Sequence, residues 1–359
     1  MKWLLSSGRK KNEDIKSVKQ HLIVLIPYLW LILFFLIPFI IVFKISFSVQ
    51  EVAIPPYTSL VVYNTDLNQL SIFVNFTNYQ EIFEQFSSSL LYELNPFNFL
   101  TKIVHFDQLY QFLSQQNLIT SGQNIYIKAY IYSVYYALLT TFFCLLMGYP
   151  IAYAITKVRF KYRNILLLLV MLPFWTSFLL RVYAWMSLLS MNGIINQLLQ
   201  NISIFLSKVL NTTISIGLWD MFYNEFSLVL VLVYTYLPFM ILPLYTQLIK
   251  IDPKLRQAAA DLGAKPFKTF TQITWPLSKP GVIAGSMLVF IPVVGEYVVP
   301  ELVGGSENLM IGKVLWQAFF DQNNWPLASA VAVVMVAILI IPLVIHHRSE
   351  NKHHSGEAK

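Results

Sequence analysis

The stretch QAAADLGAKPFKTFTQITWPLSKPG, residues 257–281, separates two long apolar runs of a very hydrophobic chain. Asp252 precedes it and can cap a helix whose first residue is Pro253, because the side-chain oxygen at a cap accepts from free backbone amides. Gly263 is placed to end that helix in a left-handed conformation. Pro266 is placed to begin a second short helix. The segment therefore predicts an ordered helix–turn–helix between two membrane segments.

The first of these helices carries a narrow apolar face. Four residues recur at i, i+3, i+4 and i+7, a spacing that places them on one side. They are Leu255, Ala258, Ala259 and Leu262. Such a helix could dock into a groove of another protein, or it could lie on the lipid surface. The residues alone leave both interpretations open.

The rest of the chain has the composition of an integral membrane protein. Its 359 residues are 56% hydrophobic and 12% charged, whereas soluble domains carry about 25% charged residues. Six apolar runs could cross about 30 Å of hydrocarbon as helices that rise about 1.5 Å per residue. The runs cover residues 22–46, 125–155, 165–190, 226–249, 280–302 and 326–346. The predicted fold is all-α, with six transmembrane helices.

Lysine and arginine are spread unevenly over the segments between these runs. The two tails, 1–21 and 347–359, and the loops after the second and fourth runs together hold 19 of them, against three in the opposite loops. Cytoplasmic segments carry the excess of positive charge. Both tails and the loop 250–279 are therefore predicted to be cytoplasmic, and the basic net charge reflects topology rather than nucleic-acid binding.

This orientation leaves residues 47–124 as an extracytoplasmic insertion between the first two spans. The insertion is polar and mildly acidic, yet its scattered Phe, Leu and Tyr residues favour a small folded cap over a disordered linker. Residues 125–346 then form a five-span core that includes the cytoplasmic loop 250–279.

The sequence contains no motif of an enzyme or a metal site. A phosphate-binding loop requires G-x4-G-K-[ST], but Val314 follows the Gly312-Lys313 pair of this chain. The single cysteine, Cys144, lies in an apolar run and is expected to serve packing. We therefore predict a chain that is not an enzyme and holds no metal or cofactor of its own.

The loop resembles the EAA loop of ABC importer permeases, whose pattern is E-A-A-x3-G-x9-I-x-L-P. Gln257 stands in place of the Glu and Trp275 in place of the Leu, while the other positions and spacings match. The resemblance implies the type I ABC importer permease fold and a coupling helix that docks into a cleft of an ATPase subunit. The coupling residues that it implies are Gln257, Ala258, Ala259, Asp261, Gly263, Ile273 and Pro276.

A second segment, PELVGGSENLMIGKVLWQAFFDQNNWPLASAVAVV at 300–334, looks specifically like the permeases of spermidine/putrescine importers. The likeness extends over about 125–345 and the first span. It implies a multi-pass protein of the bacterial inner membrane that transports putrescine or spermidine. The implied partners are a second, related permease, two ATPase subunits that bind ATP and magnesium, and an extracytoplasmic binding protein.

A path for a polyamine should offer carboxylates and aromatic faces, because rings attract cations by about 0.5–2 kcal/mol. Glu296 lies in the outer half of the span 280–302, where nearby prolines and Gly295 predict a bent or broken helix. An ionisable group inside a membrane costs about 2.5–3.5 kcal/mol, so Glu296 needs a role. We expect it in the substrate path, with Tyr297, Glu301 and Trp185 as weaker candidates.

Alternatives remain open at this point. Arg181, in the span 165–190, has a similar predicted depth, so Glu296 could form an ion pair with it that has no part in transport. Trp185 also fits an interfacial aromatic belt. Two other functions are an ABC importer permease for another small solute and an ion-coupled secondary transporter. The first, with an anionic solute, would need more basic residues than Arg181, and the second more carboxylates than Glu296.

Overall fold

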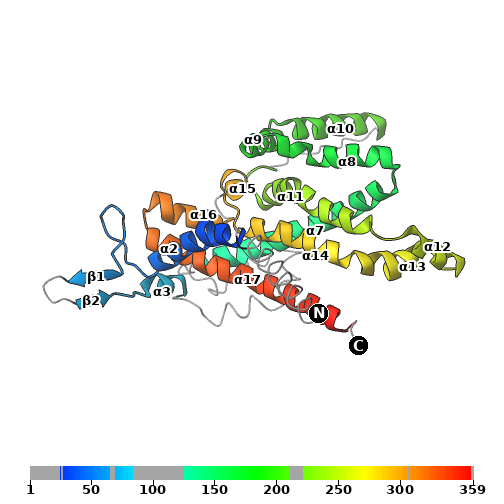
Figure 1. Cartoon of the computed structure of the whole chain (residues 1–359). Coiled ribbons are helices and arrows are strands. Elements are labelled where there is room, and N and C mark those ends of the chain that lie inside the picture. Colours follow the sequence, from blue (N-terminus) through cyan, green and yellow to red (C-terminus); the bar gives the residue numbers. More distant parts are fainter. Residues whose placement is uncertain are drawn as a thin grey trace, which may run out of the picture. The chain divides into compact units, whose positions relative to one another are not determined.

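The structure, a computed structural model, describes residue 25 and residues 27–64, 69–83, 125–210, 221–305 and 308–356. Helices make up most of this part of the chain (Figure 1), so the predicted helical class is confirmed. The chain divides into two compact units, Gln85–Gln317 and Met1–Glu84 with Ala318–Lys359. The predicted tail 1–21 and residues 84–124 of the insertion lie outside the described residues.

Five helical stretches of the described residues are long and apolar enough to cross a membrane. They are Pro27–Ile45, Ile125–Lys157, Phe178–Phe205, Glu225–Leu248 and Pro266–Val294. A further apolar stretch, Trp325–Ile341, is shorter and belongs to helix α17 (Trp325–Gly356), which runs on through most of the predicted tail 347–359. The sixth crossing, at 326–346, stays a prediction.

The third predicted span, 165–190, is not one helix. It consists of α8 (Phe160–Met171), the 3-10 turn η2 (Leu172–Trp175) and α9 (Phe178–Leu189), with extended backbone at Thr176 and Ser177. Pro173 lies at the start of the 3-10 turn, where its missing amide hydrogen favours the end of α8. A further helix, α10 (Ile194–Leu210), follows and packs on α9.

The fifth predicted span, 280–302, has different limits. Helix α13 (Pro266–Thr269), the π-helical turn η3 (Phe270–Thr274) and α14 (Trp275–Val294) follow one another without leaving helical dihedral angles. The helix therefore starts in the loop that precedes the predicted span. It ends at Val294, and the short helix α15 (Val298–Leu302) follows. The predicted break around Glu296 is confirmed, and it divides this segment in two.

Three long helices form the centre of the unit Gln85–Gln317: α7 (Ile125–Lys157), α11 (Glu225–Leu248) and α14. They lie side by side, with α13 and α12 (Pro253–Asp261) at one end and α15 and α16 (Ile311–Trp316) toward the other (Figure 1). Most of the buried apolar side chains of this unit come from these three helices.

Two glycines of α14 let its backbone approach α11 closely. A Cβ at Gly281 would lie 2.7 Å from Cβ of Gln247, and a Cβ at Gly285 would lie 2.8 Å from Sδ of Met240. Both distances are shorter than real contacts allow. Small residues at such positions permit close packing of helices within a membrane, so α11 and α14 are held together along the half nearest to α12.

Hydrogen bonds tie the segment after α14 to the other end of this bundle. Ser227, in the first turn of α11, donates from its hydroxyl to the Val303 carbonyl at 3.0 Å. The Ile311 amide donates to the hydroxyl of Ser133 in α7 at 2.7 Å. The Tyr136 hydroxyl lies 2.7 Å from Oδ1 of Asn308. These bonds fix α15 and α16, which carry or flank the acidic residues predicted for the substrate path.

The other unit holds the described part of the predicted insertion. After η1 (Ile32–Leu36) and α2 (Ile37–Ile45), strands β1 (Val61–Asn64) and β2 (Gln69–Ile72) form an antiparallel hairpin, and α3 (Thr77–Phe83) follows. Asn78 of α3 donates to the carbonyls of Ser46 and Ser48 at 2.9 and 2.8 Å. Helix α17 packs on α2 and α3.

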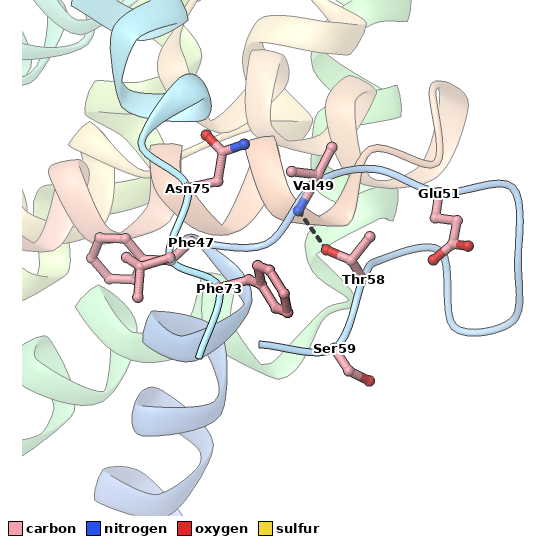
Figure 2. A pocket seen from close by; sticks show the side chains of 8 residues that line it. Phe47, Val49, Glu51, Thr58, Ser59, Phe73 and Asn75 are labelled. Atoms are coloured by element: carbon pink, nitrogen blue, oxygen red, sulfur yellow. Dashed lines mark hydrogen bonds between the residues drawn. The ribbon is translucent and has the colours of Figure 1, made fainter. Parts of the chain in front are cut away.

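Figure 2 shows an open hollow of about 670 Å³ beside the end of α2. The Phe47 and Phe73 rings lie on one side of it, and the Val49 amide donates across the loop to the Thr58 hydroxyl at 3.1 Å. Glu51, Ser59, Val74 and Asn75 complete the lining. None of the residues predicted for coupling or for the substrate path lines this hollow.

Candidate functional site

The predicted coupling loop is folded as its residues indicate. The Asp252 side chain accepts from the Lys254 amide at 2.9 Å, and Pro253 is the first residue of α12. Gly263 has a φ of +78°. The Gly263 amide donates to the Ala260 carbonyl and the Ala264 amide to the Ala259 carbonyl, each at 2.9 Å. This pair of bonds closes the helix in a Schellman motif.

The loop presents apolar side chains to its surroundings. Leu262 is 89% exposed and Phe267 79% exposed, and no residue of α12 is buried. Among the predicted coupling residues, Ala259 and Ile273 are half-buried and the others are exposed; these are Gln257, Ala258, Asp261, Gly263 and Pro276. The exposed turn between α12 and α13 thus has the shape and the apolar character of a docking surface.

The loop is also joined to the bundle behind it. The Tyr149 ring of α7 lies 5.7 Å from the Phe270 ring and 5.4 Å from the Trp275 ring, measured between centroids. Its hydroxyl is hydrogen-bonded to the Ser278 hydroxyl at 2.9 Å. Trp275, which departs from the family pattern, therefore has a partner within this chain.

Glu296 lies in the gap between α14 and α15, where the helix is broken. Its Oε2 accepts from the Tyr236 hydroxyl of α11 at 2.5 Å, and its Oε1 accepts from the Val298 amide at 3.1 Å. Tyr236 is 8% exposed, while Glu296 is half-buried. The arrangement holds a carboxylate at a fixed position on a break in a membrane helix.

Arg181 of α9 does not form the predicted ion pair with Glu296 in this structure. Its guanidinium carbon lies 5.1 Å from the Phe174 ring centre and 5.7 Å from that of Phe178. Its Nε and Nη1 atoms are buried without a hydrogen-bond partner. Ring contacts connect the surroundings of Arg181 to those of Glu296, because the Phe239 ring lies 5.0 Å from the Phe174 ring and 6.1 Å from the Tyr236 ring, measured between centroids.

The weaker candidates each have a partner of their own. Glu301 forms an ion pair with Lys313, with 3.0 Å between Oε2 and Nζ. The Tyr297 ring stacks on Trp316 at 4.4 Å and an interplanar angle of 7°. Trp185 meets the Tyr234 ring edge-on at 5.2 Å. The structure thus groups Glu296 with Tyr236. Arg181, Glu301, Tyr297 and Trp185 take part in separate contacts.

Sequence reasoning missed Tyr236 and Lys313. Tyr236 lies in an apolar run. A buried tyrosine hydroxyl normally finds a hydrogen-bond partner, so its position could have indicated a polar contact inside the bundle. Lys313 was considered only as one of the three basic residues in the extracytoplasmic loops and as part of a false phosphate-binding motif. A lysine in an apolar stretch 12 residues after a glutamate could have suggested the pair, but their contact depends on the turn between α15 and α16.

Comparison with known proteins identifies the family. The model of the family "Binding-protein-dependent transport system inner membrane component" matches residues 127–350. The spermidine/putrescine transport system permease protein PotB of Haemophilus influenzae is 39% identical over 213 residues, which are 59% of this chain and 70% of that protein. PotB of Escherichia coli is 36% identical over 225 residues, 63% of this chain and 78% of that protein.

A third relative is the inner membrane ABC transporter permease protein YdcU of Escherichia coli. It is 32% identical over 205 residues, which are 56% of this chain and 65% of that protein. The matched region holds both the coupling loop and Glu296. This chain belongs to the family of binding-protein-dependent transport system inner membrane components, and it is a multi-pass helical protein of the inner membrane.

Proposed function

We propose that this chain is the transmembrane permease subunit of an ATP-driven bacterial importer of putrescine or spermidine. It forms half of the translocation path and is coupled to a separate ATPase subunit. The observation that carries the proposal is the identity of 36–39% to the two PotB proteins over 213 and 225 residues, and the family model itself matches a region that includes the coupling loop and Glu296. The geometry of the coupling loop and the geometry around Glu296 both support the proposal.

The exposed turn between α12 and α13 supports the coupling role. A subunit that hydrolyses ATP in the cytoplasm must move the spans of a chain that has no ATP site of its own. Leu262 and Phe267 offer an apolar surface for it, and the contacts of Tyr149 with Phe270, Trp275 and Ser278 join that surface to α7 and α14. A displacement of the turn would therefore displace α14 as well.

Glu296 supports the cationic substrate class. Its carboxylate is kept in place by Tyr236 and the Val298 amide, and an ammonium group of a polyamine could bind to it as a counter-ion. Aromatic rings that can attract cations lie on the neighbouring elements, at Tyr297, Trp316 and Trp185. A transporter of anions would instead need a basic group that is accessible to its substrate.

The complete importer would contain a second, related permease, two ATPase subunits and an extracytoplasmic binding protein. ATP and magnesium would be bound by the ATPase subunits. We place both termini and the loop 250–279 in the cytoplasm and count a sixth crossing at 326–346, on the distribution of lysine and arginine. The loaded binding protein would dock outside, and closure of the ATPase pair would open the path inward.

The test is uptake of labelled putrescine and spermidine by cells with and without the gene. Each culture is measured under ATP depletion and, separately, under proton uncoupling with ATP maintained. Gene-dependent uptake that follows ATP is expected. Uptake that stops with the proton gradient alone would instead identify an ion-coupled secondary transporter, and gene-dependent uptake of neither polyamine would reject the substrate class.

A further inference from the structure

Helix α16 contacts the segment at the break between α14 and α15 at three points. The Trp316 ring stacks on the Tyr297 ring at 4.4 Å between centroids. The Lys313 ammonium forms an ion pair with Glu301 of α15 at 3.0 Å. The third contact comes from Gly312, which is buried and lies against main-chain atoms of the break. Three of the six residues of α16 therefore hold this segment in place.

The contact at Gly312 leaves no room for a side chain. A Cβ at this position would lie 2.5 Å from the carbonyl oxygen of Gly295 and 2.6 Å from that of Glu296. Both oxygens belong to the main chain, so neither can swing aside as the end of a side chain could. Carbon and oxygen atoms stay about 3.3 Å apart even in C–H···O contacts, so an alanine would push α16 and the break apart by about 0.7 Å.

The break depends on such outside contacts because its own backbone bonding is incomplete. Pro300 stands four residues after Glu296 and has no amide hydrogen, so it cannot donate to the Glu296 carbonyl as a continuing helix would. Helix α16 is itself fixed to the bundle, since the Ile311 amide donates to the Ser133 hydroxyl of α7 at 2.7 Å. The bundle thus supports the Glu296 main chain through α16.

We propose that Gly312 is a positioning residue for the substrate site: by letting the α16 backbone lie against the break, it sets where the Glu296 carboxylate stands in the path. The inference rests on the proposed polyamine function. The carboxylate accepts from the Tyr236 hydroxyl and the Val298 amide, and both bonds require the Glu296 main chain to stay where α16 holds it. Gly312 acts through Glu296 and does not itself bind the substrate.

A displacement of this size should act mainly on the substrate site. Hydrogen bonds between two oxygen atoms span only about 2.5–3.0 Å, so a shift of about 0.7 Å would weaken or break the bond between Tyr236 and Glu296. The carboxylate would then take several orientations and hold an ammonium group poorly. The coupling loop, at the other end of α14, keeps its contacts. ATP hydrolysis should therefore continue while less substrate is moved.

The decisive variant is Gly312→Ala. Gly193→Ala is its matched control, because a Cβ there would come equally close to two main-chain carbonyl oxygens of α9, away from the break. Trp316→Leu loosens the same segment without a clash, since it removes the ring that stacks on Tyr297, and Trp316→Phe keeps a ring at that place. If the Gly312→Ala chain does not reach the membrane, the two Trp316 variants carry the test.

Each variant is reconstituted into proteoliposomes as the complete importer with its ATPase subunits and partner permease. Uptake of labelled spermidine and ATP hydrolysis are measured in the same samples, both with loaded binding protein. For Gly312→Ala we expect uptake to fall about tenfold, the size of a lost hydrogen bond to a charged group, with ATP hydrolysis within about twofold of wild type. Trp316→Leu should lower uptake about threefold, the size of one lost aromatic pair, and Trp316→Phe by less than about twofold.

Gly193→Ala should lower the melting temperature and leave the uptake per ATP unchanged. Variants that act through the same group are not additive, so Gly312→Ala should lower uptake by less than about twofold when Glu296→Gln is already present. Uptake and ATP hydrolysis that fall together, or losses at Gly312 and Glu296 that multiply, would overturn the inference and leave the polyamine function intact. A wild-type complex that hydrolyses ATP with loaded binding protein but moves no polyamine overturns both.

Discussion

The coupling loop and the Glu296 cluster are built on different kinds of information. In the loop, each structural feature follows from a residue within a few positions, as with the cap at Asp252 and the left-handed turn at Gly263. In the cluster, Glu296 is held by a residue 60 positions away, in another helix. The difference teaches that the proposed docking surface can be predicted from neighbouring residues, whereas the proposed substrate site depends on helix packing.

The largest expected effect tests whether the loop is a docking surface. Leu262→Asp introduces a charge at a highly exposed apolar residue. Loss of such an anchor residue weakens an interface by about 2 kcal/mol, which lowers the affinity roughly thirtyfold. Uptake should fall to near background while the chain stays in the membrane. Co-purification of the ATPase subunit measures the contact itself. Val52→Asp, at a fully exposed apolar residue of the other unit, should leave both unchanged.

The next effect tests the cluster. Glu296→Gln keeps the shape of the side chain and its hydrogen bond to the Val298 amide but removes the charge. We expect polyamine uptake to fall by about tenfold, since a charged partner contributes roughly 1.5–3 kcal/mol to a hydrogen bond. Glu51→Gln, which removes an exposed charge outside the spans, is the control. Normal uptake kinetics at normal membrane levels would exclude Glu296 from the path.

A smaller effect should follow from Tyr236→Phe, which removes the hydroxyl that donates to Glu296 and leaves the ring. The carboxylate keeps its charge but loses one of two bonds that orient it, so uptake should fall by about threefold, for a bond worth about 0.5–1.5 kcal/mol. Tyr234→Phe is the matched control, because Tyr234 contacts Trp185 through its ring. Equal losses in both variants would contradict the orienting role.

The smallest effect should come from Gly263→Ala in the loop. A Cβ at Gly263 has open space within 4 Å, so the cost is that of placing alanine at positive φ, about 1–2 kcal/mol. We expect a slightly lower melting temperature of the purified complex and uptake reduced by less than half. Loss of activity as severe as that of Leu262→Asp would mean that the turn geometry, rather than the apolar surface, makes the contact.

The limits of sequence reasoning follow the same division. Capping residues, glycine at positive φ and runs of apolar residues act over a few positions, so α12, its end at Gly263 and most of the spans were predictable. The break between α8 and α9 was overlooked because the apolar run 165–190 continues across it. Pro173 is not a sufficient signal, since Pro150, Pro238 and Pro280 lie inside unbroken helices. The bond between Tyr236 and Glu296 and the pair of Lys313 with Glu301 depend on packing and turns that no local pattern encodes.

The π-helical turn η3 has a consequence for the angle at which the loop faces its partner. A π-helical turn accommodates one residue more than the α-helix around it, and each residue of an α-helix adds about 100° of rotation. Deleting one residue within Phe270–Thr274 would turn α13 and the exposed Leu262 and Phe267 by about that angle relative to α14. The spacing of nine residues between Gly263 and Ile273 therefore fixes the direction, around the helix axis, in which the exposed Leu262 and Phe267 side chains face. Trp275 keeps its contact with Tyr149.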